Sequence, residues 1–261
     1  MGNKAIDEYK IKKVSHNIPE DFQDVVIKEQ PLTIFVNGYE LVTLMTLPDK
    51  LKELSIGFLA SEGILEHKSE IKNIEFSHQN TITRVELDKE LDINLFKKRT
   101  LTSGCGKGIT FTNLQDCAVK GINKDSLGLQ ANSINQLMTA MQKRATLFEQ
   151  TGGTHTAALA DGSQLLYVIE DIGRHNTIDK IIGKALLDGI TLKNKVILTS
   201  GRVSSEIIIK IIKQQIPILI SRSAPTSAAV EIAREKDITL IGFTRGKRYN
   251  IYNDLNRIKY S

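Results

Sequence analysis

The chain has 261 residues, of which 41% are hydrophobic and 25% charged, values typical of a globular protein with one large domain or two smaller ones. No apolar run approaches the roughly 20 residues that cross a bilayer, and the polar start MGNKAIDEYKIKK lacks the apolar segment of a secretory signal. We therefore expect a cytoplasmic protein with no membrane partner. The net charge of +5 suits an anionic ligand or simply solubility. With only two cysteines and no CxxC, a disulfide framework and a four-thiolate zinc site are not expected.

The first half of the chain predicts hairpins around one helix. Asn37-Gly38 stands between the apolar runs LTIFV and YELVTLMTL, and this dipeptide is typical of a two-residue hairpin turn. A helix is predicted over DKLKELSIGFLASEG, because its apolar residues suit one buried face and Gly63 can end it. The segment IKNIEFSHQNTITRVEL predicts a second hairpin that turns at Gln79-Asn80. A glycine-rich connection over residues 94–111 follows.

The second half alternates helices with strands. Ser133 and Gln136 have the spacing of a capping box ahead of one helix, INQLMTAMQKRATLFEQ, which Gly152-Gly153 would end. A hairpin is predicted around Asp161-Gly162. Then follow a helix RHNTIDKIIGKALLDG, a strand KVILTS, a helix VSSEIIIKIIKQQ, a strand IPILIS, a helix PTSAAVEIAREK with Pro225 near its first turn, and a strand ITLIGF. The β-branched run EIIIKIIKQQ would also suit a strand, but two parallel strands need a crossover between them.

This order of elements predicts an α/β fold with a mixed, mostly parallel sheet that carries helices on both faces. We expect two domains. A smaller, hairpin-rich α+β domain would cover residues 1–125, and a three-layer α/β/α domain would cover residues 126–261. The boundary falls within CAVKGINKDSLGLQA.

Arginines follow four of the predicted strands. Ligands of such sheets bind beyond the carboxyl ends of the strands, and these ends carry Arg174 (with His175), Arg202, Arg222 and Arg245. Guanidinium groups, hydroxyls and amides at helix starts bind phosphate. Four arginines at one edge indicate a site for a multiply charged anion. The alternative is that these arginines lie at the rim of the sheet and contact only solvent. His155 is a further candidate contact, unless it only satisfies a local backbone group.

Other ligand classes fit the sequence poorly. A Walker A motif and a GxGxxG motif are both absent, which counts against an ordinary nucleotide triphosphatase or dinucleotide site. Aromatic residues are only 5%, which counts against a single-stranded nucleic acid. The five histidines include no HExxH pattern, so no metal ligands are expected.

Cys105 lies in the segment Ser103-Gly104-Cys105-Gly106-Lys107-Gly108. This many glycines predict a loop with high backbone freedom and little side-chain cover, whereas a structural cysteine usually packs in an apolar run. Lys107 would favour the thiolate. The pattern indicates a reactive sulfur. Cys117, in LQDCAVK, is interpreted as packed or incidental.

Six segments in this order resemble the formate dehydrogenase accessory sulfurtransferase family (FdhD): LTSGCGKG, TGGTHTAAL, EDIGRHNTIDKIIGKAL, LTSGRVSSE, ISRSAPTSAAVEIA and GFTRGKRYNIY. The resemblance covers most of the chain. It implies a cytidine-deaminase-like fold without the deaminase zinc site. It also implies a sulfur carrier that accepts persulfide sulfur from a cysteine desulfurase and transfers it to the bis-guanylyl molybdenum cofactor (bis-MGD), as formate dehydrogenase activity requires.

The resemblance assigns roles to residues of this chain. Cys105 matches the persulfide cysteine. The family's cofactor-binding segment corresponds to Phe243, Thr244, Arg245, Gly246, Lys247 and Arg248; further candidate contacts are His155, Arg174, His175, Arg202 and Arg222. Partners would be a cysteine desulfurase, formate dehydrogenase, guanine nucleotides as cofactor mimics and a second copy in a homodimer. Gly108 replaces the second cysteine that many members carry, so a mechanism with two loop thiols is not expected here.

Two other functions stay open at this point. The protein could be a non-catalytic chaperone that binds and delivers the guanylyl molybdenum cofactor, with Cys105 incidental. A nucleobase deaminase would rest on fold analogy alone, and it would need bound zinc, which is not expected.

Overall fold

The computed structural model describes residues 5–77, 80–91, 100–101, 109–110, 122 and 127–260. Its first elements are β1 (Ile6–Ser15), β2 (Ile18–Ile27), β3 (Gln30–Val36), β4 (Tyr39–Thr46), α1 (Leu51–Ser61), the 3-10 turn η1 (Lys68–Glu70), β5 (Ile71–Phe76), β6 (Ile82–Leu87), β7 (Thr100–Leu101) and β8 (Ile109–Thr110). The second group is β9 (Leu129–Gln130), α2 (Ala131–Lys143), α3 (Thr146–Thr151), β10 (His155–Ala160), β11 (Leu165–Asp171), α4 (Arg174–Leu187), β12 (Val196–Thr199), α5 (Ser205–Lys213), β13 (Ile218–Ser221), α6 (Ser227–Glu235), β14 (Thr239–Arg245), β15 (Arg248–Asn253) and β16 (Ile258–Lys259).

The N-terminal sheet has four strands in the order β4-β3-β6-β5. Both predicted hairpins are present, since β3 pairs antiparallel with β4 and β5 with β6. Asn37 and Gly38 have φ values of 47° and 85°, as a hairpin turn with two left-handed residues requires. The second turn is described only in part, because Gln79 lies outside the described residues. Helix α1, which follows β4 and precedes β5 in the chain, covers one face of this sheet, and the central strands β3 and β6 are parallel.

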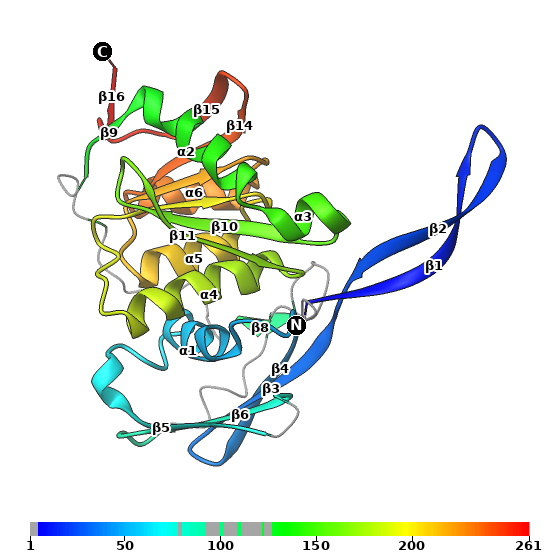
Figure 1. The fold of residues 1–261 in the computed structure, drawn as a ribbon. Helices are drawn as coiled ribbons and strands as arrows, with labels where there is room; N and C mark the ends of the chain where they lie inside the picture. The colour runs from blue at the N-terminus through cyan, green and yellow to red at the C-terminus, as the bar shows by residue number, and fades with distance from the viewer. Residues whose placement is uncertain are drawn as a thin grey trace.

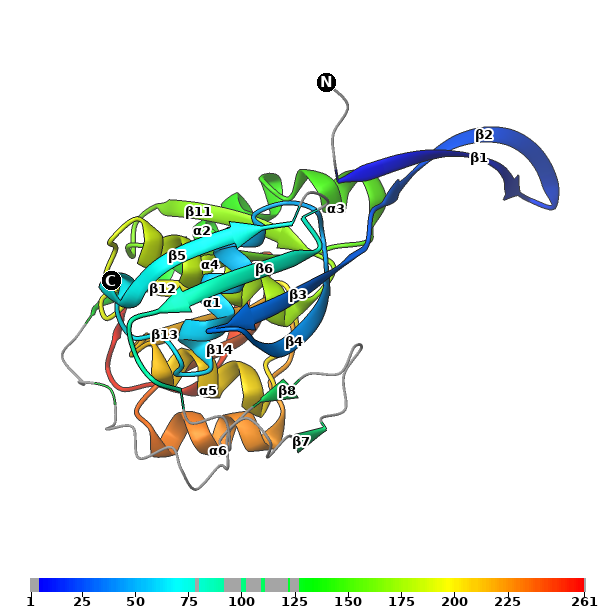
Figure 2. The same cartoon turned by 90° about the horizontal axis from the view of Figure 1, so that it is seen from below.

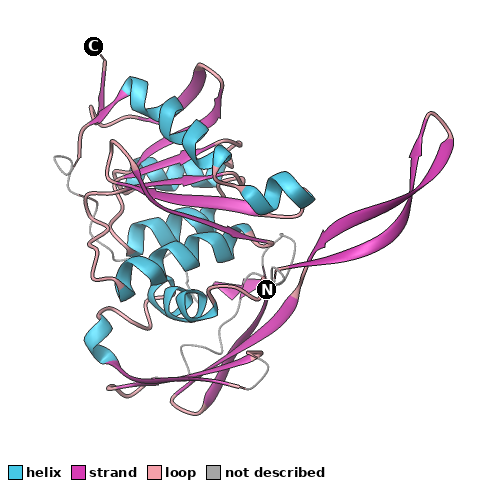
Figure 3. Ribbon diagram, viewed as in Figure 1, coloured by secondary structure: helices cyan, strands magenta, loops and turns pink. Residues whose placement is uncertain are grey.

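The large sheet has six strands in the order β11-β10-β12-β13-β14-β15. Alternate residues of β10 face opposite sides: Ala157 and Leu159 pack with α4, α5 and α6, whereas Ala158 and Ala160 pack with α2. Strands β12, β13 and β14 are parallel, and β10 and β15 run antiparallel to their neighbours. The sheet is therefore mixed with helices on both faces, as the sequence predicts (Figure 3). The prediction that it is mostly parallel is wrong, because three of its five strand pairings are antiparallel. Segment 205–213 is a helix, not a strand.

Two further sequence predictions for this half are wrong, and one strand was missed. The capping box is absent, because α2 begins at Ala131 and Ser133 lies inside it. The predicted single helix is broken after Lys143 into α2 and α3. At the break the carboxylate of Glu170 accepts hydrogen bonds from the amides of Leu147 (2.9 Å) and Phe148 (2.7 Å). A partner from β11 thus satisfies amides that a continuous helix would bond internally. Strand β15 was not predicted at all.

The two parts of the chain meet where α1 crosses α4 (Figure 1). A Cβ built on Gly57 would lie 1.7 Å from the Asp179 carbonyl oxygen, and one built on Gly183 would lie 1.9 Å from the Glu53 carbonyl oxygen. Only glycine permits this backbone-to-backbone approach. Helix α1, buried on nearly all sides, is thereby the layer between the two sheets. The predicted domain boundary at residues 125 and 126 lies outside the described residues and stays a prediction.

A buried ion cluster reinforces this junction. The Nζ of Lys210, on α5, lies 2.8 Å and 2.9 Å from the carboxylate oxygens of Asp179 on α4 and 3.2 Å from Glu62 after α1. Ser61 donates a 2.6 Å hydrogen bond to Asp179 and accepts one of 2.8 Å from Lys210. Burial opposes the charged ammonium, but the two carboxylates outweigh it and raise the pKa of Lys210. None of the helices in the described ranges is long and apolar enough to cross a bilayer.

Replacing Gly183 with alanine tests the helix crossing. The new methyl group meets backbone atoms of α1, so the helices must separate, and we expect Gly183→Ala to lower the free energy of unfolding by about 3 kcal/mol. Urea denaturation measures this. Gly128→Ala is the control, because its Cβ would meet only the side chain of Lys259 at 3.5 Å. Equal stability of the two variants would refute the close crossing.

Replacing Lys210 with methionine tests the ion cluster. The substitution leaves two buried carboxylates without their cation, which costs about 3–5 kcal/mol of unfolding free energy near neutral pH. Because the folded pKa of Lys210 lies above the ordinary 10.5, its contribution is complete below that pH and is lost as pH rises through the folded pKa. The difference between wild type and Lys210→Met should thus shrink above pH 10.5. Lys193→Met, at an exposed position, should be neutral at all pH values.

Candidate functional site

The carboxyl ends of β11, β12, β13 and β14 meet at one edge of the large sheet. The registers place Asp171 opposite His155, Thr199 opposite Ala157, and Ser221 opposite Thr199. The prediction that the arginine-bearing strand ends share an edge is therefore confirmed. Because β10 runs antiparallel, its first residue, His155, lies at this same edge.

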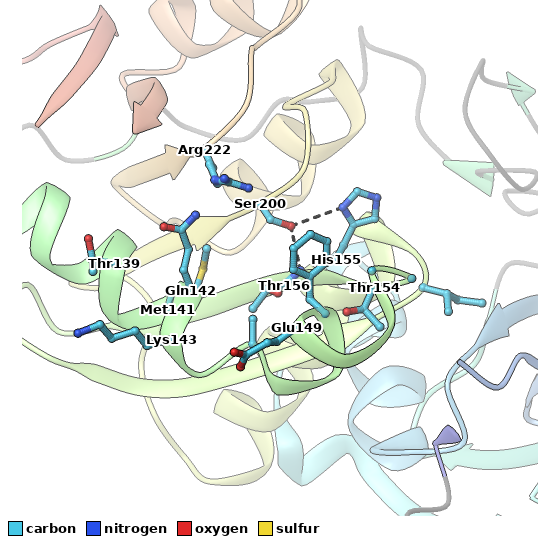
Figure 4. A pocket seen from close by; sticks show the side chains of 15 residues that line it. Thr139, Met141, Gln142, Lys143, Glu149, Thr154, His155, Thr156, Ser200 and Arg222 are labelled. Atoms are coloured by element: carbon cyan, nitrogen blue, oxygen red, sulfur yellow. Dashed lines mark hydrogen bonds between the residues drawn. The ribbon is translucent and has the colours of Figure 1, made fainter. Parts of the chain in front are cut away.

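A pocket of about 700 Å³ opens at this edge, beside α2 and α3. Figure 4 shows Arg222, Ser200 and His155 following one another along the strand ends. Helices α2 and α3 contribute the lining residues Met141, Gln142, Lys143, Phe148 and Glu149. The pocket thus combines an apolar floor with charged groups of both signs. Of the predicted residues, it brings together His155 and Arg222.

His155 is half-buried and lies in a positively charged setting. Its Nδ1 is 3.5 Å from the Ser200 hydroxyl, which in turn accepts a 2.9 Å hydrogen bond from the amide of Thr156. Burial lowers the pKa of His155, and the nearby charges of Arg174 and His175 lower it further. The Asp171 carboxylate acts in the opposite direction but does not compensate. The lowered pKa favours the neutral imidazole near neutral pH, and this form accepts one hydrogen bond and donates another.

Arg174 and His175 begin helix α4 next to His155. The Cβ of Arg174 lies 2.9 Å from a Cβ built on Gly201, so Gly201 permits this close packing. The Nε of Arg174 is buried and has no hydrogen-bond partner among the described residues. His175 Nε2 lies 2.9 Å from a carboxylate oxygen of Glu206, at the start of α5. His175 thus faces Glu206, whereas Arg174 keeps donor capacity for a ligand.

The segment from Phe243 to Arg248 is a hairpin rather than a simple strand end. β14 continues to Arg245, Gly246 turns the chain with φ of 58°, and β15 starts at Arg248. Phe243, Arg245, Lys247 and Arg248 are exposed, and Arg245 donates a 3.3 Å hydrogen bond to the carbonyl of Arg222. The hydroxyl of Thr244 is buried without a partner among the described residues. This hairpin places basic side chains beside Arg222, while Arg202 is exposed after β12.

Sequence reasoning missed Asp171, the residue that organises this edge. Its carboxylate accepts hydrogen bonds from Thr46 (2.5 Å), the amides of Leu47 (3.3 Å) and Gly173 (2.9 Å), and the side chain of Asn176 (2.9 Å). The Nζ of Lys180 lies 2.5 Å away, and both side chains are fully buried. The sequence signal that could have identified Asp171 is an aspartate at the end of an apolar strand. Asp171 fixes the start of α4, and hence Arg174, to the end of β4.

Cys105, Lys107, Gly108 and Cys117 lie outside the described residues. The chain on either side of Cys105 is described, however, because β7 pairs antiparallel with β8. Leu101 faces Ile109 in this ladder. Among the described residues, no group of three His, Cys, Asp or Glu side chains could hold a metal ion.

A family model described as "FdhD/NarQ family" matches residues 27–259. The chain belongs to this family. The FdhD/NarQ relatives include the sulfur carrier protein FdhD of Bacillus pumilus, 44% identical over 90% of each chain, and that of Bacillus licheniformis, 40% identical over 100% of each chain. The crystal structure of a proposed formate dehydrogenase accessory protein from Desulfotalea psychrophila superposes with a TM-score of 0.79, 25% identity and coverage of 98% of this chain and 100% of that one.

The setting of His155 in this FdhD/NarQ protein can be tested by titration. Nuclear magnetic resonance of the imidazole should give a midpoint below the ordinary 6.5. Arg174→Gln removes a positive charge that lowers the pKa, so the midpoint should rise. Arg84→Gln, in the N-terminal sheet, is the control and should leave the midpoint unchanged. An unshifted midpoint in Arg174→Gln would contradict the proximity of the two side chains.

Proposed function

We propose that this protein is a sulfur carrier for the maturation of formate dehydrogenase. In this proposal Cys105 accepts sulfur as a persulfide from a cysteine desulfurase, and the sulfur passes to bis-MGD, which is the substrate. The observation that carries the proposal is the convergence of basic strand ends at one edge beside a pocket, in a chain whose relatives at 40–44% identity are named sulfur carrier proteins.

The first step requires only a reactive thiolate. The Cys105 thiolate attacks the terminal sulfur of the desulfurase persulfide. The donor S–S bond breaks as the new one forms, and the donor cysteine leaves as a thiolate. No external oxidant or reductant is needed. Since Gly108 replaces the second cysteine seen in many relatives, Cys105 carries the sulfur without a resolving thiol in its own segment.

The second step requires that a bulky polyanion be held near Cys105. The exposed Arg202, Arg222, Arg245, Lys247 and Arg248 offer charge-assisted hydrogen bonds to phosphate groups. The unpartnered Nε of Arg174 and hydroxyl of Thr244 add buried donors at the same edge. The donor set therefore fits the phosphates of a guanylyl cofactor, and a guanine nucleotide should serve as its mimic.

The alternative is a chaperone that binds bis-MGD without carrying sulfur. The basic edge supports both functions equally, since it concerns only the cofactor. The likeness to cytidine deaminases, which the family resemblance implies, does not distinguish the two functions. The two functions differ in the role of Cys105, so a substitution of this residue distinguishes them.

Substitution of Cys105 tests the proposal. The full-length protein is incubated with a cysteine desulfurase and cysteine, and its intact mass is measured. Wild type and the control Cys117→Ala should gain one sulfur atom, while Cys105→Ala should gain none. Formate dehydrogenase activity should also be lost in cells that carry Cys105→Ala. Sulfur uptake by Cys105→Ala, or normal maturation in such cells, would favour the chaperone.

The binding of the cofactor at the basic edge is tested separately. Arg245→Ala with Arg248→Ala should weaken binding of guanosine diphosphate by about 100-fold, because two charged hydrogen bonds to phosphate are lost. Isothermal titration calorimetry measures this. Arg84→Ala, on the other sheet, should bind like wild type. The double variant should still accept sulfur on Cys105, and unchanged nucleotide binding would refute this part of the proposal.

A further inference from the structure

His155 lies at the basic edge without a role in the proposed sulfur transfer. Strand β10 runs antiparallel to β12, so its first residue enters the edge at which the parallel strands end. In Figure 4 the imidazole stands at the wall of the pocket and points toward Ser200. A Cβ built on Gly201 would lie 3.3 Å from the Cδ of Arg174 and 3.6 Å from the Nδ1 of His155, so these two side chains are neighbours across the glycine. His155 is therefore next to the groups that would hold a phosphate.

The protein holds the imidazole of His155 in place without fixing its charge. Among the described residues, the ring has one hydrogen-bond contact, which joins Nδ1 to the Ser200 hydroxyl at 3.5 Å. That hydroxyl already accepts the amide of Thr156 at 2.9 Å. It can donate its proton to Nδ1 of the neutral ring, and it can accept a proton from Nδ1 of the charged ring with its second lone pair. Both forms of His155 therefore fit the same position.

Charged groups surround the ring on each element that packs at this edge. The carboxylate of Asp171 is bound to Lys180, that of Glu206 lies 2.9 Å from His175, and that of Glu170 accepts hydrogen bonds from two amides of α3. These acids are thus engaged, whereas the arginines of the edge have no carboxylate partner among the described residues. The basic groups are Arg174 and His175 on α4, Arg222 after β13 and Lys143 on α2, and the acids are the exposed Glu149 on α3, Glu170 and Asp171 on β11, and Glu206 on α5.

The pocket rim also touches the root of an arm that strands β1 and β2 form. These strands pair with each other over ten residues and project from the body of the protein (Figures 1 and 2). A Cβ built on Gly153, which lines the pocket, would lie 2.8 Å from the Cγ2 of Ile27, so this contact is apolar. Lys28 and Asp7 form a 2.8 Å ion pair at the root and offset each other. The charge beside His155 is therefore set by the sheet edge and not by the arm.

A bound phosphate group reverses the sign of the charge that His155 meets. In the empty site, burial and then the charges of Arg174 and His175 hold the pKa of His155 below its usual 6.5. A diphosphate held by the arginines of the edge brings negative charge to the same place. Because one opposite charge within about 4–6 Å moves a pKa by about 1–3, the ligand raises the pKa of His155 into the neutral range.

We propose that a phosphate-bearing ligand binds the basic edge together with one proton, which His155 takes up from solvent. The ligand class, a guanylyl diphosphate diester, rests on the proposed function, and the uptake of the proton goes beyond it. No covalent bond of the ligand changes in this step, and the imidazolium becomes a charged donor to a phosphate oxygen. The empty edge thus carries one positive charge fewer than the occupied edge.

The sign of the pH dependence follows from this uptake. Between the pKa of His155 in the empty site, which lies below 6.5, and the higher pKa in the complex, the ligand binds more tightly as the pH falls. The affinity changes by up to about tenfold per pH unit in this window, because one proton is bound per ligand. Above the pKa of the complex the ring is neutral in both states, so its contribution is lost.

Isothermal titration calorimetry of the full-length protein with diguanosine diphosphate tests this. Both phosphates of this ligand are diesters, so it lacks the terminal phosphate that titrates near pH 6 in ordinary nucleotides. Titrations near pH 7 in Pipes, imidazole and Tris, whose enthalpies of ionisation differ, give the number of protons taken up from the change in observed enthalpy between buffers. Wild type should take up about 0.5 of a proton or more per ligand.

Two histidine variants complete the calorimetric test. His155→Gln keeps a polar side chain that does not titrate, so it should bind the ligand without proton uptake and with an affinity that does not depend on pH. His16→Gln, at the exposed turn between β1 and β2, is the matched control and should take up protons like wild type. Proton uptake by His155→Gln, or binding by wild type without uptake, would overturn the inference. Binding without uptake leaves the proposed function intact, whereas a wild type that does not bind the ligand contradicts both.

Nuclear magnetic resonance of wild type tests the same step without any substitution. The titration midpoint of the His155 imidazole should rise by about 1 or more when the site is saturated with diguanosine diphosphate. The midpoint of His16 should stay where it is, because that residue is at the far end of the arm. A His155 midpoint that does not move in the saturated protein would show that the ligand binds without this proton.

Discussion

The backbone contact between α1 and α4 is the constraint on which the rest of the molecule depends. Two glycines, Gly57 and Gly183, let the helices approach until a carbonyl of each fills the place of the other's missing side chain. The cluster around Lys210 then locks α5 to the same crossing with buried charges that are costly to separate. Through this junction the small sheet and the large sheet share one middle layer of helices. The N-terminal sheet therefore packs against the large sheet through these shared helices.

The candidate site inherits its geometry from that junction. Asp171 ends β11 and binds the end of β4 through Thr46 and Leu47, and it binds the start of α4 through Gly173 and Asn176. The position of Arg174 is therefore set by elements from both halves of the chain. The mixed sheet positions the other side chains of the site. Because strands β12, β13 and β14 are parallel, the residues that follow them lie at the same edge. A polar site can lie there because helix starts and strand ends leave donors without internal partners.

Much of this architecture could be predicted from the sequence, and the failures have physical reasons. The Asn37-Gly38 turn and the helix at 174–187 follow from local signals. The helix at 205–213 follows from the crossover that two parallel strands need, and the shared edge of the arginines follows from the same topology. The break between α2 and α3 could not be predicted, because Glu170 makes it from a distant strand. The arm of β1 and β2 was missed because its apolar residues alternate irregularly among charges. Asp171 was missed because one buried carboxylate looks like any aspartate until five donors surround it.

The cores on both sides of the Cys105 segment bear on the kinetics of the proposed transfer. Leu91 packs on the N-terminal core, and Ile122 packs on the core of the large sheet. In the proposed function the carrier cysteine and the basic edge belong to the same chain, so delivery of sulfur to a cofactor bound there would be an intramolecular step. The rate of delivery would then not depend on protein concentration, and only the loading step would depend on collisions with a partner.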